Sequence, residues 1–225
     1  MKVGSRFDDK MAFSKLLLPI QPDDHIQGAP DALYTLVEYG DYECPDCGRL
    51  FVTISALCSR LGENVRVVFR HYPRSGLHPR AQQAAEAAEA AGAQGKFWEM
   101  HHLLFANQNA LTNRDLYKYA ELLQLDSKRF HDEISHRTYE NRVREDFRRG
   151  VANGVYGTPG LFINGIRYDG ALDENSLLTQ VQRRGCDNVE APRHPPPSQH
   201  APAPEQSRAR RRMTCPFRPA AAPNA

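Results

Sequence analysis

Two cysteines three residues apart, Cys44 and Cys47, constrain this chain more than any other feature. An apolar run typical of a buried strand, residues 32–39, comes just before them, and apolar residues at helical spacing follow. The sequence therefore predicts that the pair lies where a strand gives way to a helix. The first turn of a helix has unpaired N–H groups and the positive end of the helix dipole, and both favour the nucleophilic thiolate.

The spacing of the pair also suits a reversible disulfide, because residues i and i+3 share one face of a helix. Pro45 fits the first helical turn, where an N–H would have no partner in any case. We expect Cys44 to be the exposed attacking thiol and Cys47 to be the shielded resolving thiol. Zinc binding is the alternative for a Cys-x-x-Cys pair, but it needs a second pair of ligands. The sequence shows none, so no metal is expected.

Length and composition are those of one soluble globular domain: 225 residues, 40% hydrophobic and 25% charged. A net charge of +2 points to no specific nucleic-acid partner. The chain has no apolar run long enough to span a membrane, and its first 22 residues lack the apolar core of a signal peptide. We therefore expect a cytoplasmic protein, in which Cys-x-x-Cys is more often catalytic than structural.

The order of predicted elements indicates an α/β fold. The strands at residues 32–39 and 64–72, with the helix between them, predict a parallel βαβ unit with a right-handed crossover. Asn164-Gly165 between two apolar runs predicts a β-hairpin, and a closing helix follows at 173–183. Between these parts, four helical segments are expected, at residues 81–91, 96–105, 111–123 and 126–151.

Three parts of the chain follow from this order. Residues 1–30 are expected to form an N-terminal arm. Residues 31–185 form the main domain, with a helical insertion at about 79–154. Residues 186–225 are rich in proline and arginine and hold few large apolar side chains, so they are expected to be disordered.

Several short motifs accompany the Cys-Pro-Asp-Cys turn. They are the stretch from Glu38 to Pro45, Gln94-Gly95-Lys96-Phe97-Trp98, Gly157-Thr158-Pro159 and Phe162-Ile163-Asn164-Gly165. Together with the helical insertion they resemble the DsbA-like branch of the thioredoxin superfamily. They are similar to bacterial DsbA-family thioredoxin-like proteins, some free-standing and others fused to sodium/proton antiporters. The resemblance covers about residues 22–183 and implies a thioredoxin-like fold.

The resemblance implies roles for residues outside the cysteine pair. Pro159 is expected to be a cis proline that faces the cysteines, and the backbone of Thr158 is expected to pair with an extended substrate segment. Glu38 is expected to be a buried acid that accepts the Cys47 proton. Pro45 and Asp46 complete the predicted substrate-binding set with Thr158.

The predicted function is thiol–disulfide exchange through mixed disulfides with protein or small-molecule thiols. No cofactor is required, because the two cysteines carry the electrons. The best-known oxidants of the branch have histidine where this chain has Asp46. A carboxylate there is expected to raise the pKa of the Cys44 thiol and to place the pair on the reducing side.

Two other functions remain open for a chain of this kind. One is a thioredoxin-fold binding or chaperone module that acts without turnover, in which Cys44→Ser would keep function. The other is a glutathione-dependent transferase- or isomerase-like enzyme, whose relatives often carry serine or a single cysteine at the site. The presence of both Cys44 and Cys47 favours the oxidoreductase.

Overall fold

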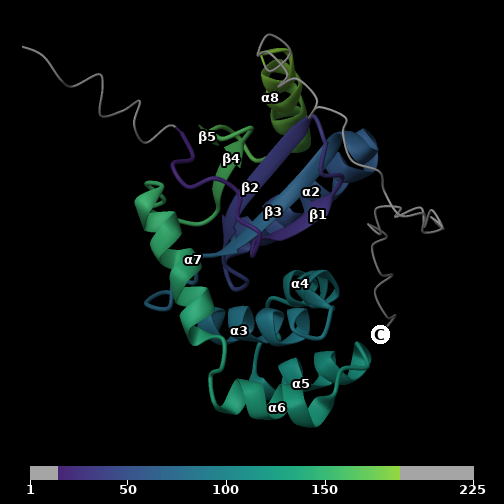
Figure 1. Cartoon of the computed structure of the whole chain (residues 1–225), viewed down its shortest axis with the longest axis vertical. Helices are drawn as coiled ribbons and strands as arrows, with labels where there is room; N and C mark the ends of the chain where they lie inside the picture. The colour runs from purple at the N-terminus through teal and green to yellow at the C-terminus, as the bar shows by residue number, and fades with distance from the viewer. Residues whose placement is uncertain (1–14, 188–225) are drawn as a thin grey trace, which may run out of the picture.

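A mixed five-stranded sheet forms the centre of the protein (Figure 1). The computed structural model describes residues 15–187, with side chains to residue 183. The strands lie in the order β1-β3-β2-β4-β5, and only β2 and β3 run parallel. Their bounds are β1 His25–Gly28, β2 Tyr34–Gly40, β3 Val65–His71, β4 Gly160–Ile163 and β5 Ile166–Tyr168.

The predicted βαβ unit is present at the centre of this sheet. Helix α2, Pro45–Leu61, and the short 3-10 helix η1, Gly62–Asn64, connect β2 to β3. Pro45 is the first helical residue and Gly62 ends α2 with φ +57°, as the residue types predict. The unit carries the cysteine pair to the carboxyl end of β2.

Helices cover both faces of the sheet. On one face α2 and α8, Glu174–Asp187, enclose an apolar core with β2 and β4; its fully buried members include Leu36, Leu50, Leu57, Ile163, Leu177 and Val181. On the other face α7, Glu140–Ala152, places Phe147 against a second core around Tyr39, Tyr72 and Phe162. The sheet is therefore a buried middle layer.

A helical layer lies across the end of the sheet where the cysteines are found (Figure 1). It consists of α3 Ala81–Gly92, α4 Phe97–Ala106, α5 Asn113–Leu122 and α6 Ser127–Ser135, and α7 leads from it back to β4. The buried residues of these helices form one apolar cluster with Phe69, Cys44 and Cys47. The cysteine pair thus lies at the junction of sheet and helices.

The prediction of a single helix at 126–151 is wrong, because the chain forms two helices there, α6 and α7, with a turn between them. Arg137 in this turn adopts the left-handed conformation, with φ +52°. Its guanidinium donates to Glu86 of α3 at 2.9 Å. The turn contains no glycine or proline, so the local sequence does not signal it. The contact that accompanies it is with a distant helix, α3.

The N-terminal boundary also differs from the prediction. His25–Gly28, assigned to the arm, forms edge strand β1 against β3. Arg70 of β3 fixes the preceding segment, since it donates to the carboxylate of Asp24 and to the carbonyls of Leu18 and Pro19. The predicted tail lies outside the described residues except for residues 186 and 187, which end α8. No described helix is long and apolar enough to cross a bilayer.

Candidate active site

Cys44 and Cys47 open helix α2 as the sequence predicts. Cys44 is the N-cap residue, in extended conformation with φ −76° and ψ 121°, and Cys47 lies in the first turn. Both are free cysteines in this structure, with no disulfide bond between them. Cys47 is fully buried, but Cys44 is only 5% exposed, so the predicted exposed attacker is largely covered.

Two distant segments cover Cys44. The side chain of Gln108, from the loop after α4, donates to the carbonyls of Tyr42 and Cys44 at 2.9 and 2.8 Å. The Thr158 carbonyl accepts from the Cys44 thiol with an Sγ–O distance of 3.5 Å. The Thr158–Pro159 peptide bond is cis. The α7–β4 loop therefore lies directly over the attacking sulfur, although 114 residues separate it from Cys44 in the sequence.

The pKa of the Cys44 thiol is lowered to about 6. Donation from the Cys47 thiol to the Cys44 thiolate is the largest cause, and the Thr158 side chain and the Cys47 backbone N–H act in the same direction. Burial of Cys44 and the negative charge of Asp41 oppose this shift. A thiol with this pKa is mostly thiolate at pH 7 and is a strong nucleophile.

The pKa of Cys44 lies below its ordinary value, so the repulsion expected from Asp46 does not set it. Asp46 forms an ion pair with Arg49 on the outer side of α2, and both side chains are about half or more exposed. Water and the guanidinium screen the carboxylate there. The hydrogen bonds to the sulfur outweigh any repulsion from Asp46.

The pKa of Cys47 is raised well above its ordinary value. Burial is the main cause, followed by its hydrogen bond to Cys44 and by the negative charges of Glu38 and Cys44. The two cysteines therefore differ in protonation near neutral pH, since Cys44 is a thiolate and Cys47 a thiol. This difference matches the attacking and resolving roles that their order in the helix predicts.

Glu38 is a buried residue of β2, only 2% exposed. Its Oε1 atom has no hydrogen-bond partner among the described residues. Burial raises the pKa of Glu38 to about 8, and the negative charge of Cys44 contributes to this shift. Glu38 is thus a carboxyl group that takes up and releases a proton near neutral pH behind the cysteine pair.

Comparison with known proteins places this arrangement in a family. A family model described as Thioredoxin matches residues 21–183. This chain belongs to the thioredoxin family. Residues Cys44, Cys47 and Thr158-Pro159 all lie within the matched segment.

Curated relatives of this thioredoxin-family chain are named Na(+)/H(+) antiporters NhaA. One from Salinispora arenicola is 46% identical over 167 residues, which cover 74% of this chain and 26% of the relative. Another, from Mycolicibacterium gilvum, is 42% identical and covers 75% of this chain and 28% of the relative. The chain spans about a quarter of the length of these relatives.

Solved structures of DsbA-like proteins share the fold. BdbD from Bacillus subtilis superposes with a TM-score of 0.66 at 21% identity, over 72% of this chain and 93% of that one. A thioredoxin-like oxidoreductase from Silicibacter pomeroyi gives a TM-score of 0.64 at 26% identity, over 73% of this chain and 93% of that one. Wolbachia pipientis α-DsbA1 gives a TM-score of 0.65 at 18% identity, over 78% of this chain and 98% of that one. The predicted thioredoxin-like fold and DsbA-like resemblance are confirmed.

Asp41 is a site residue that the sequence did not single out for its contacts. It is 1% exposed, and its carboxylate accepts from the backbone N–H of Glu43 and of Arg74, each at 2.8 Å. The imidazole of His78 lies 2.7 Å from the same carboxylate. Asp41 therefore ties the cysteine turn to the loop after β3. Gln108 was also missed, because nothing near it in the sequence marks its contact with Cys44.

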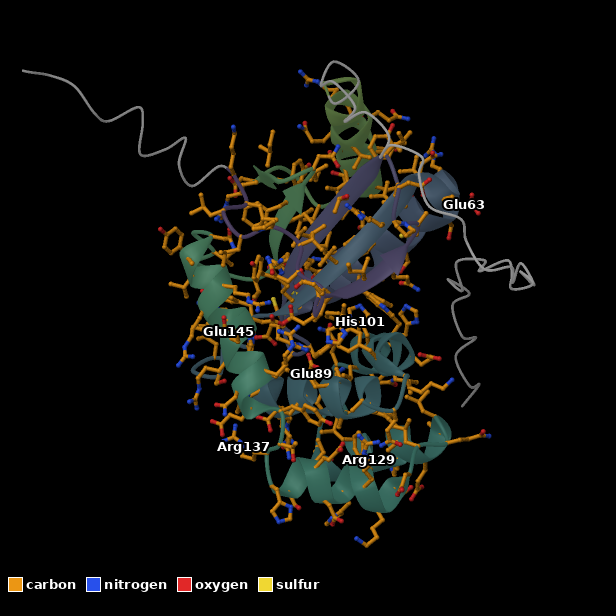
Figure 2. All side chains as sticks on the ribbon, viewed as in Figure 1. Glu63, Glu89, His101, Arg129, Arg137 and Glu145 are labelled. Carbon is orange, nitrogen blue, oxygen red and sulfur yellow. The ribbon has the colours of Figure 1, made fainter. Side chains whose placement is uncertain are left out.

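A His-Glu-His cluster joins the sheet to the helices near the site. The Nε2 atoms of His25 and His71 lie 2.8 and 3.0 Å from one carboxylate oxygen of Glu89, and the three ligand-type atoms lie within 4.8 Å of one another. Figure 2 shows Glu89 and His101 at this junction. The Arg142 guanidinium lies 3.8 Å from the same oxygen. This cation favours a hydrogen-bonded carboxylate over a metal ion, and no cysteine of the described residues belongs to such a cluster.

Proposed function

We propose that the chain is a thiol–disulfide oxidoreductase that acts through Cys44 and Cys47 on protein or small-molecule thiols and disulfides. The observation that carries the proposal is the opposed titration of the two sulfurs. The pKa of Cys44, at a helix N-terminus, is lowered to about 6 mainly by a hydrogen bond from the Cys47 thiol, whereas the pKa of buried Cys47 is raised. Cysteines that only pack in an apolar core do not require such a difference in pKa.

In the first step the Cys44 thiolate attacks one sulfur of a substrate disulfide. The substrate S–S bond breaks, and a bond forms between Cys44 and that sulfur. The other substrate sulfur leaves as a thiolate and takes a proton from solvent. The Thr158 carbonyl lies over Cys44, and we infer that the Thr158 backbone aligns an extended substrate segment when the substrate sulfur takes its place beside Cys44.

In the second step Cys47 loses its proton and attacks the Cys44 sulfur. The mixed disulfide breaks, Cys44 and Cys47 form a disulfide, and the second substrate sulfur leaves as a thiolate. Two electrons have then passed to the substrate, whose two thiolates take protons from solvent, and the Cys47 proton remains on the base that accepted it. The reverse sequence of steps oxidises a substrate dithiol.

Glu38 is suited to accept the Cys47 proton. Its pKa of about 8 is partly due to the negative charge of Cys44. That charge disappears when Cys44 enters the mixed disulfide, so the pKa of Glu38 falls and the carboxylate forms when it is needed. The same loss of charge lowers the pKa of Cys47. The first step thus prepares the proton transfer of the second.

Glu38→Gln is expected to slow the resolution of the mixed disulfide by about 10²-fold, because a general base is lost. In the wild-type chain this rate should rise with pH and level off by about pH 8 as Glu38 ionises. In the variant it should continue to rise. Rapid acid quench at a series of pH values, with mass detection of the mixed disulfide, measures both.

Glu63→Gln is the matched control for Glu38→Gln, because Glu63 is an exposed residue of η1 outside the site. Its rate and pH profile should be those of the wild type. If Glu38→Gln resolves the mixed disulfide at the wild-type rate, Glu38 has no role as a base.

We also propose that the Cys44–Cys47 pair has a low reduction potential, so that it acts as a reductant. The pKa of about 6 at Cys44 is closer to the value of about 7 in thioredoxin than to about 3.5 in DsbA. Since a more stable thiolate makes a stronger oxidant, the reduction potential is expected nearer to about −270 mV than to about −120 mV. Equilibration with glutathione followed by thiol trapping tests this. A value near −120 mV would contradict the reducing side, and failure of the disulfide to form would contradict the oxidoreductase itself.

A further inference from the structure

An open groove of about 660 Å³ lies beside the cysteine site, between the loop after β3 and helix α7. In Figure 1 this loop projects next to α7 and the start of α3. The residues that give the groove its character are Tyr72, Arg74, Leu77, Arg144, Phe147 and Tyr156. None of them belongs to the thiol chemistry described above.

The groove is continuous with the active site at two points. The backbone N–H of Arg74 donates to Asp41, three residues before Cys44, at 2.8 Å. Tyr156 lies two residues before Thr158, and a Cβ placed on the intervening Gly157 would lie 3.8 Å from the Arg74 guanidinium. A substrate segment that passes the Thr158 backbone therefore runs toward the groove.

The groove carries excess positive charge. Three arginines line it, at positions 74, 137 and 144, against a single acidic residue, Glu140. Glu140 is already engaged, at 2.6 Å from Arg144 and 3.6 Å from Arg137. None of the ion pairs among residues 15–183 involves Arg74. Its guanidinium, next to the cysteine site, is thus available to a carboxylate from outside.

The groove also offers apolar surface. The rings of Tyr72 and Phe147 stack with their centroids 4.4 Å apart. At the rim Leu77 is 63% exposed and Tyr156 is 72% exposed. Exposed side chains of this kind around a cationic group are typical of a surface that binds another chain.

We propose that this groove binds an extended acidic segment of a protein substrate, with an aspartate or glutamate beside the reacting cysteine paired to Arg74. The inference rests on the proposed function and names its substrate class. The planar guanidinium binds a carboxylate through two parallel hydrogen bonds, which a neutral amide cannot match. The aromatic side chains contact the apolar residues of the same segment.

Three peptides that differ only beside a single cysteine test the proposal. In the first peptide the residues on either side of the cysteine are glutamate, in the second glutamine and in the third lysine. The cysteine of each peptide is blocked as a mixed disulfide with 2-mercaptoethanol, which is uncharged. The second-order rate constant for reaction with the reduced full chain is measured at low and high salt. The glutamate peptide should react several-fold faster than the glutamine peptide and the lysine peptide slowest, and added salt should reduce the differences.

Variants of Arg74 assign the effect to the groove. Arg74→Gln should bring the ratio of the glutamate to the glutamine rate close to one, and Arg74→Glu should favour the lysine peptide. Arg114→Gln, an exposed position on α5 outside the groove, should keep the wild-type ratio. Circular dichroism confirms that each variant is folded.

Equal rates for the three peptides, or an unchanged ratio in Arg74→Gln, would overturn the acidic groove and leave the oxidoreductase in place. No reaction with any of the peptides would overturn both. The two proposals are therefore tested separately in one set of measurements.

Discussion

Cys44→Ser is expected to lower the rate of thiol–disulfide exchange by on the order of 10³-fold or more, because a serine hydroxyl does not ionise near neutral pH and cannot replace the thiolate. The expected rate of the wild-type chain also has a pH signature. With a Cys44 pKa of about 6, the fraction of thiolate and the rate of attack should rise through pH 6 and level off above it. Stopped-flow reaction with a disulfide reagent, and the ultraviolet absorbance of the thiolate, measure the two quantities.

Cys47→Ser is the informative companion to this variant. It keeps the attacking thiolate and loses the resolving thiol, so the first step should proceed and the mixed disulfide should accumulate. Mass spectrometry of the intact chain detects it. Because a hydrogen bond from Cys47 is the largest cause of the low Cys44 pKa, that pKa should also rise in a Cys47→Ala variant, where no hydroxyl replaces the thiol.

The two other functions considered for this chain predict different results. A binding module should keep its function in Cys44→Ser. A glutathione-dependent enzyme should need glutathione for turnover and should survive the loss of Cys47. Either result would displace the exchange cycle.

Asp24→Ala is expected to reduce the free energy of unfolding by about 3–5 kcal/mol, because it leaves a buried charge without its partner. Both carboxylate oxygens of Asp24 accept from Arg70, at 2.8 and 2.7 Å, and neither side chain is exposed. The Arg70 guanidinium also donates to the Tyr39 hydroxyl at 2.7 Å. The pair connects the segment before β1 to the middle of the sheet.

Urea unfolding of the full chain measures this effect, with Asp31→Ala as the matched control. Asp31 is exposed in the same part of the chain, so its loss should change stability by less than about 0.5 kcal/mol. The double variant Asp24→Ala with Arg70→Met should recover part of the loss, since no unpaired charge remains. A cost below about 1 kcal/mol for Asp24→Ala would show that water reaches Arg70.

The elements that the sequence predicted well are those with short-range causes. Asn164 and Gly165 both have positive φ, at 48° and 76°, as their residue types allow in a two-residue hairpin turn. Helix α5 lies within the segment predicted at 111–123, and its N-cap Thr112 forms a reciprocal capping box with Asp115, three residues on. In each case the residues that decide the conformation are neighbours in the chain.

The errors arose where a distant contact decides the structure. Arg137 turns the chain between α6 and α7 while it binds Glu86 of α3. Residues 25–28 become a strand because β3 offers an edge beside them. No local pattern of residues reports either partner.

The sequence by itself determined the chemistry of this protein: a strand, a turn and a helix that begins with two cysteines three residues apart. Only the tertiary structure decided how those cysteines titrate and how far they are exposed. The pKa of Cys44 depends on Thr158, 114 residues away, and its cover includes Gln108, 64 residues away. Local conformation follows from the preferences of adjacent residues. The exposure and the pKa of a side chain depend instead on all the atoms and charges that the fold brings near it.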